Sequence, residues 1–175
     1  FCPGYKKVED RIIRCHKKGG HGSQNFIDGI KNSCNPVFME IGARLGPEKT
    51  YYYYDKFGLF DKTGIDLPGE AGSIMHKLED IKPVELATMS FGQSFQITPL
   101  QLLRAVSAII NGGKLITPHF GVSIRSADGS YIKELDYPVI ENAISKESSE
   151  TMKELLEAVV YDGTGKRAYL PGFRI

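Results

Sequence analysis

The chain has 175 residues, of which 41% are hydrophobic and 25% charged, and these proportions are usual for a globular domain. Its 22 basic and 21 acidic side chains leave a net charge of +1, which excludes the strong positive field of a general nucleic-acid-binding protein. No apolar run reaches the roughly eighteen residues needed to cross a membrane, and no targeting segment is present. Because neither Phe1 nor Ile175 has the character of a natural end, we expect an internal piece of a longer protein.

Residues 1–22 contain four glycines and no sustained periodicity, so a loop with one short extended piece is predicted. The segment is locally basic, although Glu9 and Asp10 interrupt the basic residues. This pattern favours a solvated basic face over a phosphate-binding patch. The basic residues are Lys6, Lys7, Arg11, Arg14, Lys17 and Lys18.

Three cysteines neither demand nor exclude a disulfide, and they do not indicate a compartment. Cys2, Cys15, His16 and His21 offer the thiolates and imidazoles that bind zinc. The usual paired C-x2-C spacing is absent, however, and the adjacent Cys15 and His16 would crowd one tetrahedral ion. We therefore predict no metal and no cofactor, and favour a Cys2–Cys15 disulfide or plain buried thiols.

Three helices are predicted in the first third of the chain, at residues 24–31, 36–45 and 47–57. Ser23 is the expected N-cap of the first helix, and Asn35 that of the second, followed by Pro36 at the first helical position. Gly46 is expected to end the second helix. The four tyrosines at 51–54 would also suit a strand, but the charged flanks favour a helix.

In the remaining two thirds of the chain, the pattern predicts irregular structure at 61–73, then short and long helices, and then extended segments. A strong hairpin signal is centred on Asp128-Gly129, because both residues tolerate a positive φ. Grouped helices followed by a hairpin, a helix and a strand-like end indicate an α+β fold. The expected helices are 83–89, 99–110 and one that Ser145 caps and that runs to Val160.

The glycine-rich run from Asp162 to Lys166 has some likeness to a phosphate-binding loop. The P-loop pattern needs Gly where Val160 stands and Ser or Thr where Arg167 stands. We therefore interpret the run as a flexible turn and not as a nucleotide site.

Ser33-Cys34-Asn35 falls at the junction of the first two predicted helices. A hydroxyl and an amide two positions apart could relay protons and hydrogen-bond a substrate peptide group. Capping explains both residues equally well, so the tripeptide is a weak signal when taken alone.

Four blocks in order give the tripeptide a context: "IKNSCNPVFMEIGARLG", "FGLFDKTGIDLPGE", "SFGQSFQITPLQLLRAVSAIINGGKLITPH" and "DGTGKRAYLPGF". Together they resemble the transpeptidase domain of class B penicillin-binding proteins. The resemblance implies a beta-lactamase/transpeptidase-like α+β fold, in which helices cover an antiparallel five-stranded sheet. It also implies a serine D,D-transpeptidase that attacks D-Ala-D-Ala stem peptides, releases the terminal D-Ala and cross-links peptidoglycan through an acyl-enzyme.

This family uses three motifs in chain order: Ser-x-x-Lys, Ser-x-Asn and Lys-[Ser/Thr]-Gly. By resemblance, Ser33 would relay a proton towards the leaving amine, and Asn35 would hydrogen-bond the amide of the substrate or of a penicillin. Cys34 is the variable middle position, to which we assign no chemistry. The catalytic residues predicted within the chain are therefore Ser33 and Asn35.

The first motif is absent, since no serine or threonine before residue 75 has a lysine three positions later. We expect the nucleophile to precede Phe1 and this chain alone to be inactive. Lys62-Thr63-Gly64 spells the third motif, but Pro68 and Gly69 follow it and suit a loop. In the family, the catalytic strand comes after a segment like 162–175, so the true motif is expected beyond Ile175.

We thus interpret residues 1–175 as an internal part of one transpeptidase domain that lacks its nucleophile segment and its catalytic strand. The implied partners are stem peptides, beta-lactam antibiotics and other cell-wall synthesis proteins, without nucleic acid. The parent would be anchored upstream, with this domain at the outer face of the cytoplasmic membrane. The alternatives are a beta-lactam-sensing receptor domain, a serine beta-lactamase of the same fold, and a non-catalytic wall-binding scaffold.

Overall fold

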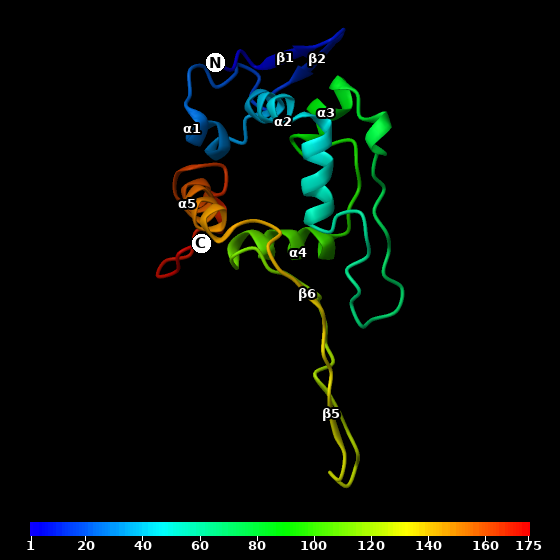
Figure 1. Cartoon of the computed structure of the whole chain (residues 1–175). Helices are drawn as coiled ribbons and strands as arrows, with labels where there is room; N and C mark the ends of the chain where they lie inside the picture. Colours follow the sequence, from blue (N-terminus) through cyan, green and yellow to red (C-terminus); the bar gives the residue numbers. More distant parts are fainter. The chain divides into compact units, whose positions relative to one another are not determined.

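The computed structural model describes all residues 1–175, and they form two compact units. The first unit comprises Phe1–Tyr52, Met75–Gln96 and Glu150–Ile175, and the second comprises Tyr53–Ile74 and Ile97–Ser149. No helix is both long enough and apolar enough to cross a membrane. Figure 1 labels the helices and strands described below.

The first unit begins with an antiparallel hairpin of β1 (Tyr5–Val8) and β2 (Arg11–Arg14), drawn in blue in Figure 1. Glu9 provides the turn with a φ of +52°. This hairpin corrects the predicted loop over residues 1–22. The sequence did not predict it because the turn contains no glycine and the strands lack a clean alternation of buried and exposed residues.

Helix α1 (Phe26–Lys31) follows, and its N-cap is Asn25, whose side chain accepts a 2.9 Å hydrogen bond from the backbone N–H of Asp28. The predicted cap, Ser23, is wrong by two residues, since α1 starts later than the apolar pattern indicated. Helix α2 (Asn35–Lys56) includes both predicted helices, and Gly46 (φ +78°, ψ +166°) interrupts them as expected. The tyrosines at 51–54 are helical, which confirms the favoured interpretation.

Four further elements complete the first unit. A 3-10 turn, η1 (Leu78–Asp80), precedes helix α3 (Pro83–Met89), whose bounds match the prediction because Pro83 starts it. Helix α5 (Lys146–Asp162) is followed by the 3-10 turn η2 (Lys166–Ala168). The prediction of a strand-like C-terminal end is wrong: residues 171–175 form no strand, since no segment of the chain pairs with them.

In the second unit, α4 (Pro99–Ile110) is fixed at its start by a capping box between Thr98 and Gln101. Gln101 is fully buried, and its Nε2 also donates a 2.7 Å hydrogen bond to the carbonyl of Asp61. One residue therefore both begins the helix and holds the irregular segment before it. Ala108, at the far end of α4, packs with Leu115 and Ala143 in the core of this unit.

Four short strands of the second unit pair in two antiparallel ladders. One ladder joins β3 (Leu115–Ile116) to β6 (Val139–Ile140), and the other joins β4 (Ser123–Arg125) to β5 (Ile132–Glu134). The second ladder is the predicted hairpin, with Gly129 at a φ of +74° in its turn. Segregated helices and antiparallel strands confirm the α+β class.

Candidate active site

The tripeptide Ser33-Cys34-Asn35 links α1 to α2. Ser33 is exposed, Cys34 is completely buried and Asn35 is half-buried, so the two polar residues flank an anchored one. The α1 helix ends in the hydrogen-bond pattern of a Schellman motif: the N–H of Ser33 donates to Ile30, and that of Cys34 to Gly29, both at 2.9 Å.

Ser33 occupies the position in this motif that is usually glycine. Its φ of +48° places it in the left-handed region, where a side chain is strained against its own backbone. Strain of this kind persists only where the surrounding structure enforces it, and it is concentrated at functional sites. The geometry thus presents the Ser33 hydroxyl at the surface at a conformational cost.

Asn35 does not act as the predicted N-cap. It is the first residue of α2, and its Nδ2 donates a 3.0 Å hydrogen bond to the backbone carbonyl of Arg14 at the end of β2. Pro36 follows it, as predicted for a helix start. Since an amide has two N–H donors and one acceptor, Arg14 takes only part of its hydrogen-bonding capacity.

The segment that follows α5 holds the junction from its other side. The backbone N–H of Thr164 donates a 3.0 Å hydrogen bond to the carbonyl of Lys31, the last residue of α1. A Cβ on Gly163 would lie 2.6 Å from that same carbonyl oxygen, which explains the glycine. The glycine-rich run is therefore a turn, as predicted, but it is packed against the end of α1 and not flexible.

An ion pair supports the same contact. Lys31 Nζ lies 3.0 Å from the carboxylate of Asp162, and Lys166 Nζ lies 3.1 Å from it. The hydrogen bonds from Lys31 and then Lys166 lower the pKa of Asp162, followed by the attraction of their charges. Asp162 and Lys166 are largely exposed and Lys31 is partly exposed, so these ion pairs orient the turn and add little stability.

Lys62-Thr63-Gly64 lies in irregular backbone of the second unit, which confirms the loop prediction. The carboxylate of Glu70 accepts hydrogen bonds from the Thr63 N–H (2.7 Å), the Thr63 hydroxyl (2.6 Å) and the Gly64 N–H (3.1 Å). Thr63 is only 3% exposed, whereas Lys62 is exposed to solvent. These contacts give Thr63 and Gly64 a structural role.

Asp66 performs a similar task in the same loop. Its carboxylate accepts hydrogen bonds from the N–H groups of Gly121 (2.7 Å) and Phe120 (2.9 Å) and from the Tyr137 hydroxyl (3.0 Å). The backbone donors of Gly121 and Phe120 hold the pKa of Asp66 below its usual range. Asp66 and Glu70 of the "TGIDLPGE" block thus have structural roles, since their carboxylates hold the loop by hydrogen bonds.

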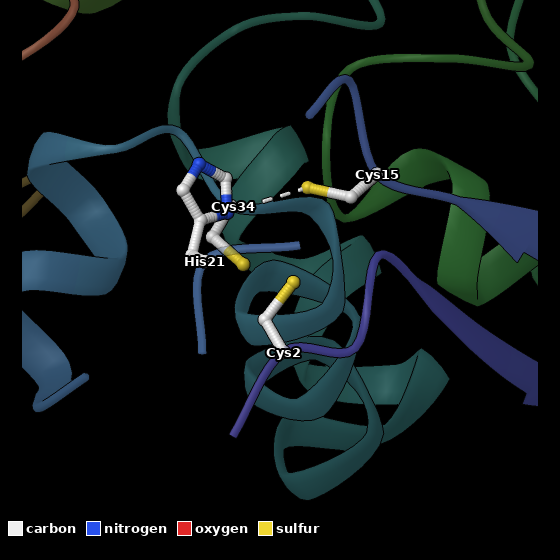
Figure 2. Close-up of side chains that lie close together, drawn as sticks. All are labelled: Cys2, Cys15, His21 and Cys34. Atoms are coloured by element: carbon white, nitrogen blue, oxygen red, sulfur yellow. Dashed lines mark hydrogen bonds between the residues drawn. The ribbon is translucent and has the colours of Figure 1, made fainter. Parts of the chain in front are cut away.

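The structure also brings together residues that the sequence did not connect. The sulfur atoms of Cys2, Cys15 and Cys34 and a ring nitrogen of His21 all lie within 4.8 Å of one another (Figure 2). All three cysteines are free thiols. The sequence pointed to His16 in place of Cys34, because His16 is next to Cys15 whereas Cys34 is distant along the chain.

Burial shifts the pKa of two members of this cluster, Cys34 and His21. Burial raises the pKa of the Cys34 thiol to about 11. Burial also lowers the pKa of His21, and the nearby His16 and Lys17 lower it further, so its ring is neutral at pH 7. A neutral imidazole has a lone pair available to bind a metal ion.

Comparisons with known proteins show the family to which the chain belongs. Residues 1–175 match the family model described as the penicillin binding protein transpeptidase domain. The chain is 43% identical over 173 residues to stage V sporulation protein D of Bacillus subtilis, covering 98% of this chain and 27% of that protein. It is 30% identical over 172 residues to the penicillin-binding protein PbpB of Mycobacterium tuberculosis, covering 93% of this chain and 25% of that one.

Solved structures show the same fold. Penicillin binding protein 3 of Mycobacterium tuberculosis matches with a TM-score of 0.88 and 27% identity, covering 98% of this chain and 40% of that one. The same protein has been solved with aztreonam and with ampicillin. The chain spans about a quarter of the length of the curated relatives it matches. On the full-length match to the family model, the chain belongs to the penicillin binding protein transpeptidase domain family.

Proposed function

We propose that this chain is part of a peptidoglycan D,D-transpeptidase and supplies the second catalytic motif of its active site. The observation that carries the proposal is Ser33, an exposed serine held at a φ of +48° in a Schellman motif, with Asn35 two positions later. Family membership supports the proposal, because Ser-x-Asn is the family's second motif.

The proposed reaction passes through an acyl-enzyme. A serine outside these 175 residues attacks the carbonyl carbon between the two D-Ala residues of a stem peptide, and the terminal D-Ala leaves as an amine. An amine of a neighbouring stem then attacks the acyl-serine, which frees the serine and completes the cross-link. Ser33 relays the proton to the leaving amine, and Asn35 donates a hydrogen bond to the substrate's amide carbonyl.

The partners of the full-length protein follow from this reaction. Stem peptides are the substrates, and beta-lactams acylate the same serine, in keeping with the aztreonam and ampicillin complexes of the related structure. The substrate lies outside the cytoplasmic membrane, so we place the domain there, anchored by another part of the protein and working beside other cell-wall synthesis proteins.

A labelled penicillin tests the proposal. It should form a covalent adduct with the full-length protein, and peptide mapping should place the label on the serine of a Ser-x-x-Lys motif outside residues 1–175. The isolated 175-residue chain should remain unlabelled. An unlabelled full-length protein would favour the scaffold alternative, and a label within residues 1–175 would overturn the assignment of the nucleophile. Rapid hydrolysis of the adduct would indicate a beta-lactamase instead.

A further inference from the structure

Three thiols and one imidazole converge in the first unit from separate parts of the chain. Cys2 precedes β1, Cys15 follows β2, His21 lies before α1, and Cys34 precedes α2. The cysteines are 1%, 6% and 0% exposed, and Figure 2 shows their sulfur atoms and the His21 ring directed towards a shared space. None of these four side chains has a part in the proposed reaction.

The spacing is close to that of a tetrahedral metal site. Zinc bonds of about 2.3 Å to sulfur and 2.0 to 2.1 Å to nitrogen place neighbouring ligand atoms about 3.5 to 3.8 Å apart. Cys15 Sγ lies 3.6 Å from His21 Nδ1, and no pair of ligand atoms is more than 4.8 Å apart. Small side-chain rotations therefore suffice to bring all four atoms into bonding range.

The backbone is built to hold two of the cysteines together. The N–H of Cys15 donates to the carbonyl of Gly4 at 2.8 Å, and Cys2 pairs with Gly22 in an isolated antiparallel bridge. Gly20 (φ +74°) lies so close that a Cβ there would overlap the carbonyl oxygen of Cys2. The chain is thus wrapped tightly around the cluster, with glycine where a side chain would not fit.

Hydrogen-bond donors also point at the sulfur atoms. The backbone N–H groups of His21 and Gly4 lie close enough to the Cys2 sulfur to favour its thiolate, and that of Val37 does the same for Cys34. The Gln24 side chain lies beside Cys34. Its Nε2 is buried and has no hydrogen-bond partner. Such N–H donors are the outer partners that metal-bound thiolates use.

We propose that Cys2, Cys15, His21 and Cys34 bind one structural zinc ion. Four protein ligands in a Cys3His set close a tetrahedral zinc site and leave no position for a reacting water. A disulfide would use only two of the three sulfurs and leave the third buried beside a histidine. On binding, the three thiols release their protons to solvent. The resulting charge of −1 lies within the basic segment formed by Lys6, Lys7, Arg11, Arg14, Lys17 and Lys18.

The objection that Cys15 and His16 would crowd one ion does not apply to this ligand set. His16 is exposed and its Nδ1 lies 4.0 Å from Cys15 Sγ, outside the four-residue cluster. Cys34 takes the place that sequence reasoning gave to His16. The ligands on the N-terminal hairpin and the one before α2 are then joined by a single ion.

This zinc ion would position the catalytic motif, an inference that rests on the proposed function. Cys34 lies between Ser33 and Asn35, so a metal bond to its sulfur fixes the peptide that connects them. Asn35 is tied to Arg14, next to Cys15, by the 3.0 Å hydrogen bond described above. The metal and this hydrogen bond therefore hold the same junction against the same hairpin.

Metal content tests the site independently of activity. The full-length protein, purified with a non-thiol reductant and without chelator, should contain about one zinc per chain. His21→Ala and Cys34→Ser should lower zinc content at least tenfold, while the matched control His16→Ala retains it. His21→Cys should also retain zinc through four thiolates, which guards against loss through misfolding. The metal site would be overturned if the wild-type protein contained no zinc or if all variants contained equal amounts of zinc. It would also be overturned if the intact mass showed a disulfide between two of the cysteines.

The positioning role has its own readout. Acylation by labelled penicillin should fall in His21→Ala together with zinc content, and both should recover in His21→Cys. Normal acylation in a zinc-free variant would overturn the positioning role but leave the metal site intact. Zinc-loaded protein that never reacts with penicillin would contradict the proposed function and not the metal site.

Discussion

Asn35 Nδ2 donates a 3.0 Å hydrogen bond to the backbone carbonyl of Arg14 and so connects the start of α2 to the end of β2. The connection joins a residue of the candidate catalytic motif to the hairpin that Cys2 and Cys15 flank. An amide at position 35 therefore has a structural task as well as its proposed contact with substrate.

Because Ser33 is strained, replacing it with glycine should raise stability while removing activity. Ser33→Gly removes the Cβ from a backbone with a φ of +48° and should raise the free energy of unfolding by about 1 kcal/mol. Ser33→Ala keeps the strain and should leave stability close to that of the wild type. Both variants should lose acylation, because both lack the hydroxyl. Urea unfolding of the full-length protein checks the first part, and a glycine variant less stable than the alanine variant would contradict it.

Gly19 and Gly20 form a matched pair that tests the close packing of the backbone after the N-terminal hairpin. A Cβ at Gly20 would overlap the Cys2 carbonyl oxygen at a φ of +74°, whereas one at Gly19 would meet no atom within 4 Å. Gly20→Ala should therefore lower the free energy of unfolding by about 3 kcal/mol, from strain and overpacking together. Gly19→Ala should change it by less than about 0.5 kcal/mol. Equal melting temperatures for the two variants would refute the close approach.

A substitution of Lys62 tests whether Lys62-Thr63-Gly64 has a catalytic role. Because Lys62 is exposed and its neighbours are held by Glu70, Lys62→Ala should leave the acylation rate within about twofold of wild type. Glu70→Ala should instead destabilise the protein by about 2 kcal/mol, since the buried Thr63 loses its acceptor. A large loss of acylation in Lys62→Ala, with folding intact, would restore this tripeptide to the active site.

The lowered pKa of Asp66 predicts that the stability of the protein depends on pH. Its pKa is held low in the folded protein by the N–H donors of Gly121 and Phe120, so its ionised form is favoured by folding. The stabilisation is complete above the ordinary carboxyl pKa of about 4 and is lost as pH falls through the lower folded value. Asp66→Asn should thus show a flatter decline in melting temperature below about pH 4. A decline as steep as in wild type would exclude Asp66 as a contributor.

Local signals in the sequence predicted the helices well. Pro83 and the Thr98-Pro99 pair begin α3 and α4 at the predicted residues, because proline at a helix start needs no partner for its missing N–H. Gly46 and Gly129 occupy the predicted positive-φ positions, because glycine has no Cβ and adopts this backbone conformation without strain. These features depend on a few neighbouring residues and can be read without knowledge of the fold.

Features that depend on tertiary contacts could not be predicted in this way. Asn35 satisfies a local capping rule, but its side chain bonds instead to Arg14, 21 positions earlier. Cys34 joins Cys2, Cys15 and His21 only because the Schellman motif after α1 turns the chain back to the hairpin. The order and spacing of the motifs were enough to predict the family, whereas the cluster of three cysteines and one histidine was found only in the structure.

The rate of acylation by labelled penicillin, measured on the full-length protein, tests the central claim most directly. Ser33→Ala and Asn35→Ala should each slow acylation by about 100-fold or more, since each removes a group proposed to act on the reacting amide. Ser23→Ala, an exposed serine ten positions earlier, is the matched control and should react at the wild-type rate. Wild-type acylation in the Ser33 and Asn35 variants would contradict the assignment and leave Ser33-Cys34-Asn35 as a structural junction between two helices.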